Sequence, residues 1–210
     1  MKYPDCAILI FTKAPVAGQV KTRLVPHISA SLAARLHETL THDRLRMCTS
    51  GNLCDVQLWC SPDTRHPFFF DCKECYQIQL HAQRGSNLGE RMSHALKTML
   101  GQYEKIIIIG TDAPALGIDT MDAAIEQLDS NDVVLVPAED GGYVLIGAAT
   151  YHEDLLVDVP WGTKNVLTNT VCNIEHLHLQ YSLLAECWDV DRPADLERYL
   201  ALNADLSALY

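Results

Sequence analysis

A run of four isoleucines, residues 106–109, constrains the fold of this chain more than any other stretch. Four consecutive β-branched apolar side chains give a strand no polar face, so helices or other strands must cover both faces. Such strands are typical of parallel sheets with helices on both sides. The run ends at Gly110, Asp112 follows, and Pro114 prevents regular strand pairing from continuing. The sequence therefore places a carboxylate at the end of a central parallel strand, where open α/β sheets bind ligands.

The rest of the hydrophobic pattern alternates short strands with helices. Strands are expected at residues 6–11, 56–60, 77–81, 105–109, 132–136, 143–147 and 181–187. Helices are expected after a cap at Ser29 or Ser31 and at residues 88–99, 119–128, 164–171 and 193–202. Thr163 is expected to cap the helix at residues 164–171, and Pro193 lies in the first turn of the last helix.

This alternation favours a three-layer α/β/α fold with a mostly parallel sheet and right-handed crossovers. The strand at residues 143–147 follows its predecessor without a helix between them, so we expect it to run antiparallel and the sheet to be mixed. The stretch from residue 61 to residue 76 shows no clear pattern and is expected to be irregular. Since the chain contains no repeat and no linker, residues 1–210 are expected to form a single domain.

The composition excludes several classes of protein. Acidic residues exceed basic ones by 27 to 16, which disfavours a nucleic-acid binder but leaves room for a small nucleotide site. No apolar run approaches the ~20 residues of a membrane-spanning helix, and the first residues lack a signal-peptide layout. We therefore expect a cytoplasmic protein with reduced cysteines, in which Cys6 and Cys60 are small buried groups. The single Cys72–Cys75 pair leaves a zinc site as a weak alternative, because its spacing matches no common zinc module.

The loop after the first strand gathers cations in an otherwise acidic chain. It contains Lys13, Gly18, Lys21 and Arg23, at the position where doubly wound folds hold phosphate groups. A P-loop is excluded because that motif requires a glycine directly before the lysine, and Val20 stands there. The lysines and the arginine can pair with phosphates, although a solvated loop that only carries surface charges would contain the same residues.

Two acids follow apolar strands at their expected carboxyl ends, Asp112 and Asp191. If they meet at one edge of the sheet, they can hold Mg²⁺ or Mn²⁺ together with the oxygens of a diphosphate. The alternative for Asp112 is a turn or helix-capping residue. The alternative for Asp191 is the cap of the last helix, and that role is compatible with metal binding.

The segment from Glu139 to Gly142 sets two acids beside a sharply turning backbone. Asp140 is the candidate general base or acceptor-orienting acid, although an ordinary β-turn explains the same residues. Trp161, between a proline and a glycine, can stack on a sugar or base, or can simply cover the core. None of the nine histidines is assigned to a metal site, because no ligand pair falls on an expected helix or strand.

Six ordered motifs resemble a known bacterial family. They are Lys13-x-Pro15-x-x-Gly18-x-x-Lys21-Thr22-Arg23-Leu24, Leu88-Gly89-Glu90-Arg91-Met92, Gly110-Thr111-Asp112-x-Pro114, Asp140-Gly141-Gly142-Tyr143, Pro160-Trp161-Gly162-Thr163 and Asp191-x-Pro193-x-Asp195-Leu196. Together they resemble the bacterial glycosyltransferase-like family classed as a domain of unknown function. Its relatives are the nucleotide-diphospho-sugar transferases of GT-A type and small nucleotidyltransferases such as the molybdenum-cofactor guanylyltransferase-like proteins.

The resemblance implies a Rossmann-like GT-A fold and a nucleotide site with a divalent metal. Asp112 matches the metal-binding acid of the superfamily, and Asp191 matches the late acid of sugar-nucleotide cytidylyltransferases. Asp140, Gly141, Gly142, Tyr143 and Trp161 are implied to line the acceptor side, with Lys21, Arg23 and Asp140 catalytic. The residues implied to contact the nucleotide are Lys13, Pro15, Gly18, Lys21, Thr22, Arg23, Thr111 and Asp112.

Three functions follow as hypotheses. The leading one is a glycosyltransferase that uses a nucleotide-diphosphate sugar, Mg²⁺ or Mn²⁺ and a small acceptor. The second is a nucleotidyltransferase that joins an NTP to a phosphorylated small molecule, and it is disfavoured because the first loop lacks the Gly-Gly start of that group. The third is a non-catalytic nucleotide-binding module, since a fold does not fix a function.

Overall fold

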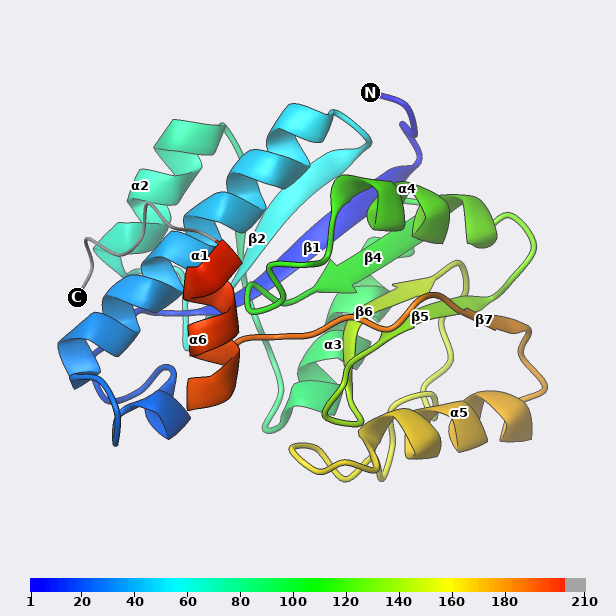
Figure 1. Ribbon diagram of the computed structural model, residues 1–210. Helices are drawn as coiled ribbons and strands as arrows, with labels where there is room; N and C mark the ends of the chain where they lie inside the picture. The colour runs from blue at the N-terminus through cyan, green and yellow to red at the C-terminus, as the bar shows by residue number, and fades with distance from the viewer. Residues whose placement is uncertain (203–210) are drawn as a thin grey trace.

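The isoleucine strand β4 (Lys105–Ile109) lies in the middle of a seven-stranded sheet in the computed structural model, which describes residues 1–202 (Figure 1). The strand order is β3-β2-β1-β4-β6-β5-β7. The bounds of the other strands are β1 Cys6–Lys13, β2 Asp55–Ser61, β3 Gln79–Ala82, β5 Val133–Pro137, β6 Tyr143–Ala148 and β7 Tyr181–Leu183. All neighbouring strands pair in parallel except β6, which runs antiparallel to both β4 and β5. The mostly parallel mixed sheet and the antiparallel strand are therefore confirmed.

Both faces of β4 are buried, as its sequence requires. Ile107 and Ile109 pack on one face beneath three helices, α1 (Ala30–Gly51), α2 (Pro67–Tyr76) and α4 (Ile118–Gln127). Ile106 and Ile108 pack on the other face with α3 (Leu88–Met99) and α5 (Val166–His176). Each of the four isoleucines is at most 3% exposed, which gives the three-layer α/β/α architecture predicted from the run.

A third apolar cluster fixes the end of the described chain. After β7 the backbone returns across the sheet to α6 (Pro193–Leu202), which lies beside α1 (Figure 1). Leu196 and Tyr199 of α6 pack with Leu36 and Leu40 of α1 and with Leu24 of a short 3₁₀ helix, η1 (Thr22–Leu24). This packing brings the segment before α6 next to the loops that follow β1 and β4.

The structure corrects the expectation for residues 61–76, where α2 forms a regular helix. Pro67 occupies the first turn, the side chain of His66 accepts a hydrogen bond from the backbone N–H of Phe68, and Gln77 ends the helix in the left-handed conformation. Phe68, Phe69 and Cys72 give the helix its buried face. The aromatic run that was expected to be irregular therefore provides the core contacts of a helix.

Two further boundaries differ from expectation. Thr163 does not cap α5: Asn165 precedes the helix, and the Thr163 hydroxyl accepts a hydrogen bond from the backbone N–H of Asn165 instead. The last strand, β7, ends at Leu183, and the segment beyond it rejoins the sheet only through an isolated bridge between Ala138 and Cys187. The expected Ser29 cap of α1 is confirmed, because its side chain accepts from the backbone N–H of Leu32.

Two further expectations concerned the burial of cysteines and the absence of a membrane-spanning helix. Cys6 and Cys60 are buried in the core as predicted, Cys72 is also buried, and Cys75 is exposed. Within residues 1–202, none of the helices combines the length and the apolar character needed to cross a bilayer.

Candidate functional site

A cavity of about 620 Å³ opens at the carboxyl ends of β1 and β4. These two strands are neighbours, but the chain leaves them in opposite directions, toward β2 and β3 on one side and toward β6, β5 and β7 on the other. A sheet of this kind leaves a crevice where its strand order reverses, because the loops after the two strands move apart. The cavity therefore lies where the sheet topology alone would place a ligand.

Lys21 joins three segments of the chain at this crevice. Its Nζ lies 2.8 Å from Oδ1 of Asp112 and donates a hydrogen bond of 2.5 Å to the carbonyl oxygen of Val190. The backbone N–H of Val190 donates in turn to the carbonyl oxygen of Asp112, at 2.8 Å. The side chain of Lys21 is only 4% exposed, so it is a buried cation with two acceptors. The first loop, the loop after β4 and the segment before α6 thus meet at one edge of the sheet, as the sequence predicted.

Asp112 is held as a carboxylate. Burial favours its neutral form, but the charge and the hydrogen bond of Lys21 and the hydroxyl of Thr111 outweigh that effect and lower the pKa of Asp112 below its ordinary value. The Thr111 hydroxyl donates to Oδ1 at 3.2 Å, and the Asp112 side chain remains 45% exposed to the cavity. Asp112 therefore presents a negative charge to any ligand that enters.

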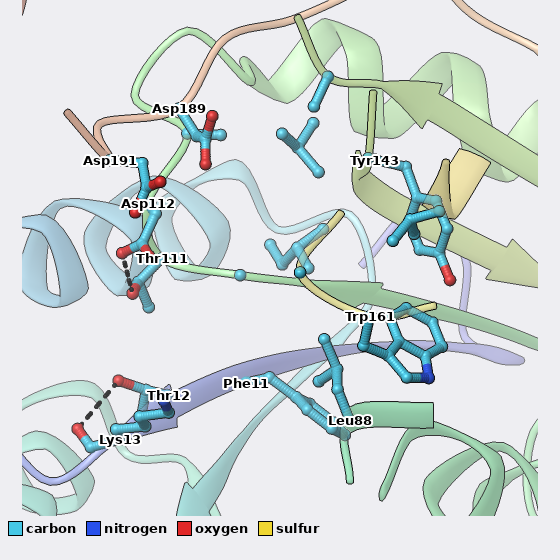
Figure 2. Close-up of a pocket in the computed structure, with 18 of the residues that line it drawn as sticks. Phe11, Thr12, Lys13, Leu88, Thr111, Asp112, Tyr143, Trp161, Asp189 and Asp191 are labelled. Atoms are coloured by element: carbon cyan, nitrogen blue, oxygen red, sulfur yellow. Dashed lines mark hydrogen bonds between the residues drawn. The ribbon is translucent and has the colours of Figure 1, made fainter. Parts of the chain in front are cut away.

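Asp191 forms an ion pair with Arg23 at the cavity wall. The hydrogen bond to this carboxylate is the main reason that the pKa of Arg23 is raised. Asp195, not Asp191, accepts the backbone N–H groups of Asp191 and Arg192 at the start of α6. The capping role considered for Asp191 from the sequence is therefore wrong, and its carboxylate faces the cavity beside Asp112 (Figure 2).

Sequence reasoning missed Asp189, which lies with Asp112 and Asp191 on the same side of the cavity (Figure 2). Burial and the neighbouring carboxylates of Asp140, Asp112 and Asp191 raise the pKa of Asp189 to about 6. The signal was present, since Asp189 and Asp191 alternate around Val190 and alternating residues of an extended segment point to the same side. This side of the cavity concentrates negative charge.

The donor set suits a divalent cation that is shared with a phosphate ligand. Within residues 1–202, His, Cys, Asp and Glu side chains form no group of three or more that could hold a metal ion by themselves. Mg²⁺ usually keeps only one or two protein carboxylates and takes its other oxygens from phosphates and water. Asp112 and Asp191 can supply that number, and burial together with the neighbouring carboxylates raises the pKa of Asp189, an effect that a cation would oppose. The residues present therefore fit Mg²⁺ or Mn²⁺.

His37 of α1 supports the first loop from beneath and was not identified from the sequence. Its Nε2 lies 3.0 Å from the carbonyl oxygen of Lys13, and its Nδ1 lies 3.9 Å from Oδ1 of Asp112. Burial lowers the pKa of this histidine, which is 5% exposed. Because a carbonyl oxygen can only accept, the neutral ring carries its proton on Nε2. His37 thus fixes the backbone of Lys13 beside the cavity.

The opposite side of the cavity is aromatic and apolar (Figure 2). Tyr143 and Trp161 lie edge to face with ring centroids 6.2 Å apart. Gly89 in the first turn of α3 makes room for the indole, because a Cβ at that position would lie 2.6 Å from Nε1 of Trp161. Trp161 therefore packs against α3, as considered for it, and also lines the cavity, while its stacking on a sugar or base stays a prediction.

The remaining expected site residues divide into two groups. Lys13, Thr22, Thr111, Asp140 and Gly142 line the cavity, whereas Pro15, Gly18 and Gly141 do not. Gly18 has a φ of 81°, and Gly141 has a φ of 89° and passes so close to Lys164 that a Cβ would overlap its backbone. These two glycines shape the loops that carry the lining residues.

Asp140 forms the turn considered for its segment and lines the cavity, while its role as a base or acceptor-orienting acid stays a prediction. Its Oδ1 accepts a hydrogen bond of 2.9 Å from the backbone N–H of Gly142, so it stabilises the turn while it lines the cavity. Gln83 and Arg91 are further lining residues that sequence reasoning did not single out. The amide nitrogen of Gln83 donates to the carbonyl oxygens of Thr12 and Trp59, which ties this side of the cavity to β1 and β2.

Comparison with known proteins agrees with the architecture. Residues 44–163 match a family described as "Uncharacterized protein conserved in bacteria (DUF2064)". No curated protein matches the chain. A crystal structure from Desulfovibrio desulfuricans G20, of a protein provisionally named a nucleotide-diphospho-sugar transferase, is 30% identical, with a TM-score of 0.86 over 98% of this chain and 96% of that one.

More distant structures share the fold. The 4-diphosphocytidyl-2C-methyl-D-erythritol synthase of Anaerococcus prevotii DSM 20548 is 12% identical, with a TM-score of 0.65 over 96% of each chain. A cytidylyltransferase of Leptospira borgpetersenii is 11% identical, with a TM-score of 0.62 over 98% of this chain and 88% of that one. The fold is therefore that of the nucleotide-diphospho-sugar transferases, as the motifs implied.

Proposed function

The chain belongs to the DUF2064 family, and from that premise we propose that it is a glycosyltransferase that moves a sugar from a nucleotide-diphosphate sugar to a small acceptor with Mg²⁺ or Mn²⁺. The observation that carries the proposal is the meeting of Lys21, Asp112 and the Val190 backbone at the crevice between β1 and β4. Because of this contact, the cations that would bind a diphosphate and the carboxylates that would hold a metal lie at one place. The name of the 30% identical relative supports the same class of reaction.

The proposed reaction is a substitution at the anomeric carbon of the donor sugar. A bond forms between this carbon and the acceptor oxygen, the bond to the diphosphate oxygen breaks, and the nucleoside diphosphate leaves with the electron pair. Lys13, Lys21 and Arg23 would pair with the phosphates. Asp140 would orient the acceptor hydroxyl and take its proton, directly or through water, from its place on the cavity wall.

Asp112 and Asp191 would hold the divalent ion, with the donor phosphates and water completing its coordination. When bound, such an ion stabilises the negative charge of a departing diphosphate. The carboxylates around Asp189 support this assignment, because they add to burial in raising the pKa of Asp189 and a cation would offset their repulsion.

Turnover tests the proposal. The protein is incubated with UDP- and GDP-sugars, Mn²⁺ and a panel of hydroxyl-bearing acceptors, and released UDP or GDP is measured. We expect release that depends on both metal and acceptor, and a loss of about a hundredfold or more in Asp112→Ala, the scale of losing one electrostatic stabiliser. Asp71→Ala, at an exposed acid on α2, is the control and should retain activity. Undiminished turnover in Asp112→Ala would refute the role of that residue.

The second candidate is a nucleotidyltransferase that joins an NTP to a phosphorylated small molecule. The fold similarity to the two cytidylyltransferases, over at least 88% of each chain, supports it. It differs in its product, since nucleotidyl transfer from an NTP releases pyrophosphate and glycosyl transfer releases a nucleoside diphosphate. Pyrophosphate formation with an NTP and a sugar phosphate would favour this candidate.

A further inference from the structure

The cavity lining carries both cations and acids, and two of the acids have no cationic partner within residues 1–202. The cations among the described lining residues are Lys13, Lys21, Arg23 and Arg91, all from the first half of the chain. From Ala138 onward the described lining residues include Asp140, Asp189 and Asp191 and no lysine or arginine. Lys21 and Arg23 are ion-paired with Asp112 and Asp191, and the guanidinium group of Arg91 donates to the Ser61 hydroxyl and the Gly85 carbonyl oxygen. Within residues 1–202, Asp140 and Asp189 form no ion pair, so a phosphate group close to these two acids is repelled.

Opposite Asp112, Asp189 and Asp191, the cavity presents partly exposed apolar surface from α3, β6 and the loop that carries Trp161. Leu88 is 45% exposed and lines the cavity. Tyr143 also lines the cavity and is partly exposed, although its hydroxyl oxygen is buried. Trp161 completes this group, and Figure 2 shows the three side chains together, opposite the acids. We call Leu88, Tyr143 and Trp161 the apolar wall.

Burial raises the pKa of Tyr143, so its phenol stays neutral and adds no charge to the wall. Exposed apolar side chains inside a cavity usually contact the apolar part of a ligand. Aromatic side chains in particular stack on sugar rings and aryl groups through dispersion and desolvation. Nearby acids supply acceptors for hydroxyl groups.

From the apolar wall and the unpaired acids Asp140 and Asp189, we propose that the acceptor is an uncharged, hydroxyl-bearing molecule with an apolar or aromatic face, and not a phosphorylated one. The acceptor's apolar face would lie on Leu88, Tyr143 and Trp161, and its hydroxyl would point toward Asp140. This inference rests on the proposed glycosyl transfer and names the acceptor class for it. It also separates that function from the nucleotidyl alternative, which requires a phosphorylated acceptor.

Matched probes test the inference by binding alone. Phenyl β-D-glucopyranoside carries hydroxyls and an aromatic face, and phenyl β-D-glucopyranoside 6-phosphate differs from it only by the phosphate. Of the three tryptophans, Trp59 and Trp188 are buried and Trp161 is partly exposed at the cavity. Quenching of tryptophan fluorescence therefore reports binding at the wall, and its loss in Trp161→Phe identifies the source of the signal.

We expect the neutral probe to bind at least about tenfold more tightly than the phosphorylated one, the scale of repulsion by nearby carboxylates. The double variant Asp140→Asn, Asp189→Asn should reduce this preference severalfold. Leu88→Ser should weaken the neutral probe about fivefold to tenfold through lost apolar contact. The matched control is Leu183→Ser, because Leu183 is 46% exposed on β7 and does not line the cavity.

Equal or tighter binding of the phosphorylated probe would overturn the inference, as would the absence of saturable binding of the neutral probe. Nucleotide binding is measured separately, by titration of UDP and GDP with Mn²⁺ into the same protein. If nucleotides bind and the probe preference is reversed, only the acceptor class is wrong. If nucleotides do not bind, the proposed function itself fails.

Discussion

Lys21 is the residue on which the site geometry most depends. Its buried ammonium group joins Asp112 and the Val190 carbonyl, so Lys21→Met removes the charge while keeping most of the stem. The buried carbonyl then loses a donor, but Asp112 is partly exposed and can be hydrated. We therefore expect a loss of about 1–2 kcal/mol in the free energy of unfolding, measured as a lower urea midpoint at unchanged slope.

Lys13→Met is the control at the residue scale. Lys13 lines the same cavity from the same loop, but its side chain is exposed. Its substitution should change the free energy of unfolding by no more than about 0.5 kcal/mol. If Lys21→Met unfolds at the wild-type urea concentration, the three segments meet without needing the lysine, and its structural role is refuted.

The sequence predicted the central site residues because their signals are local. Asp112 follows a strand that can only be central, and Lys21 and Arg23 stand out as cations in an acidic chain. Asp189 and His37 were missed for a physical reason, since their roles depend on what the fold brings near them. Burial and the carboxylates of Asp140 and Asp112, which are distant in the sequence, contribute to the raised pKa of Asp189 together with the nearby Asp191. His37 acts through the backbone of Lys13, 24 residues away.

At the scale of elements, α3 controls the apolar wall through Gly89. An alanine in a helix is usually more stable than a glycine by up to about 1 kcal/mol. Here its Cβ would meet the indole of Trp161 at 2.6 Å, so the tryptophan must move. We expect Gly89→Ala to shift tryptophan emission to longer wavelength, because the displaced indole becomes more exposed, and to weaken binding of the neutral phenyl glucoside.

Gly101→Ala is the matched control, because a Cβ there would meet only one backbone oxygen at 3.5 Å, an ordinary contact. Its emission spectrum should match that of the wild type. An unchanged spectrum in Gly89→Ala would contradict the assignment of Gly89 as the residue that admits Trp161.

The α2 helix shows why element prediction failed at one place. Its apolar residues fall at Phe68, Phe69 and Cys72, which is helical spacing, but Phe70 between them is 51% exposed and obscures the pattern. The decisive signals were at the ends, where His66 caps the helix and Pro67 begins it. Histidine is an uncommon cap, so propensity alone gives it little weight.

For the molecule as a whole, the sequence predicted the layers and the parallel direction of the strands but not their order. The four isoleucines require cover on both faces, and the missing helix before β6 indicates its reversed direction. The order β3-β2-β1-β4-β6-β5-β7 depends on pairing between distant segments, which local periodicity does not contain. The crevice between β1 and β4, and hence the place of the cavity, became known only with that order.

A ligand that binds this crevice bridges segments from three parts of the chain, so it should stabilise the whole fold. A nucleotide at a hundred times its Kd adds about 2.7 kcal/mol to the free energy of unfolding by mass action. For a chain of this size that corresponds to a rise of roughly 5–10 °C in Tm. We expect the largest rise in Tm with a nucleoside diphosphate, or the corresponding nucleotide sugar, together with Mn²⁺, measured by thermal denaturation against a panel of bases.

Asp112→Ala should lose the part of the rise in Tm that is due to Mn²⁺. The rise from nucleotide alone should persist, because Lys13 and Arg23 would still face the phosphates. An increment from Mn²⁺ that survives in Asp112→Ala would place the ion elsewhere.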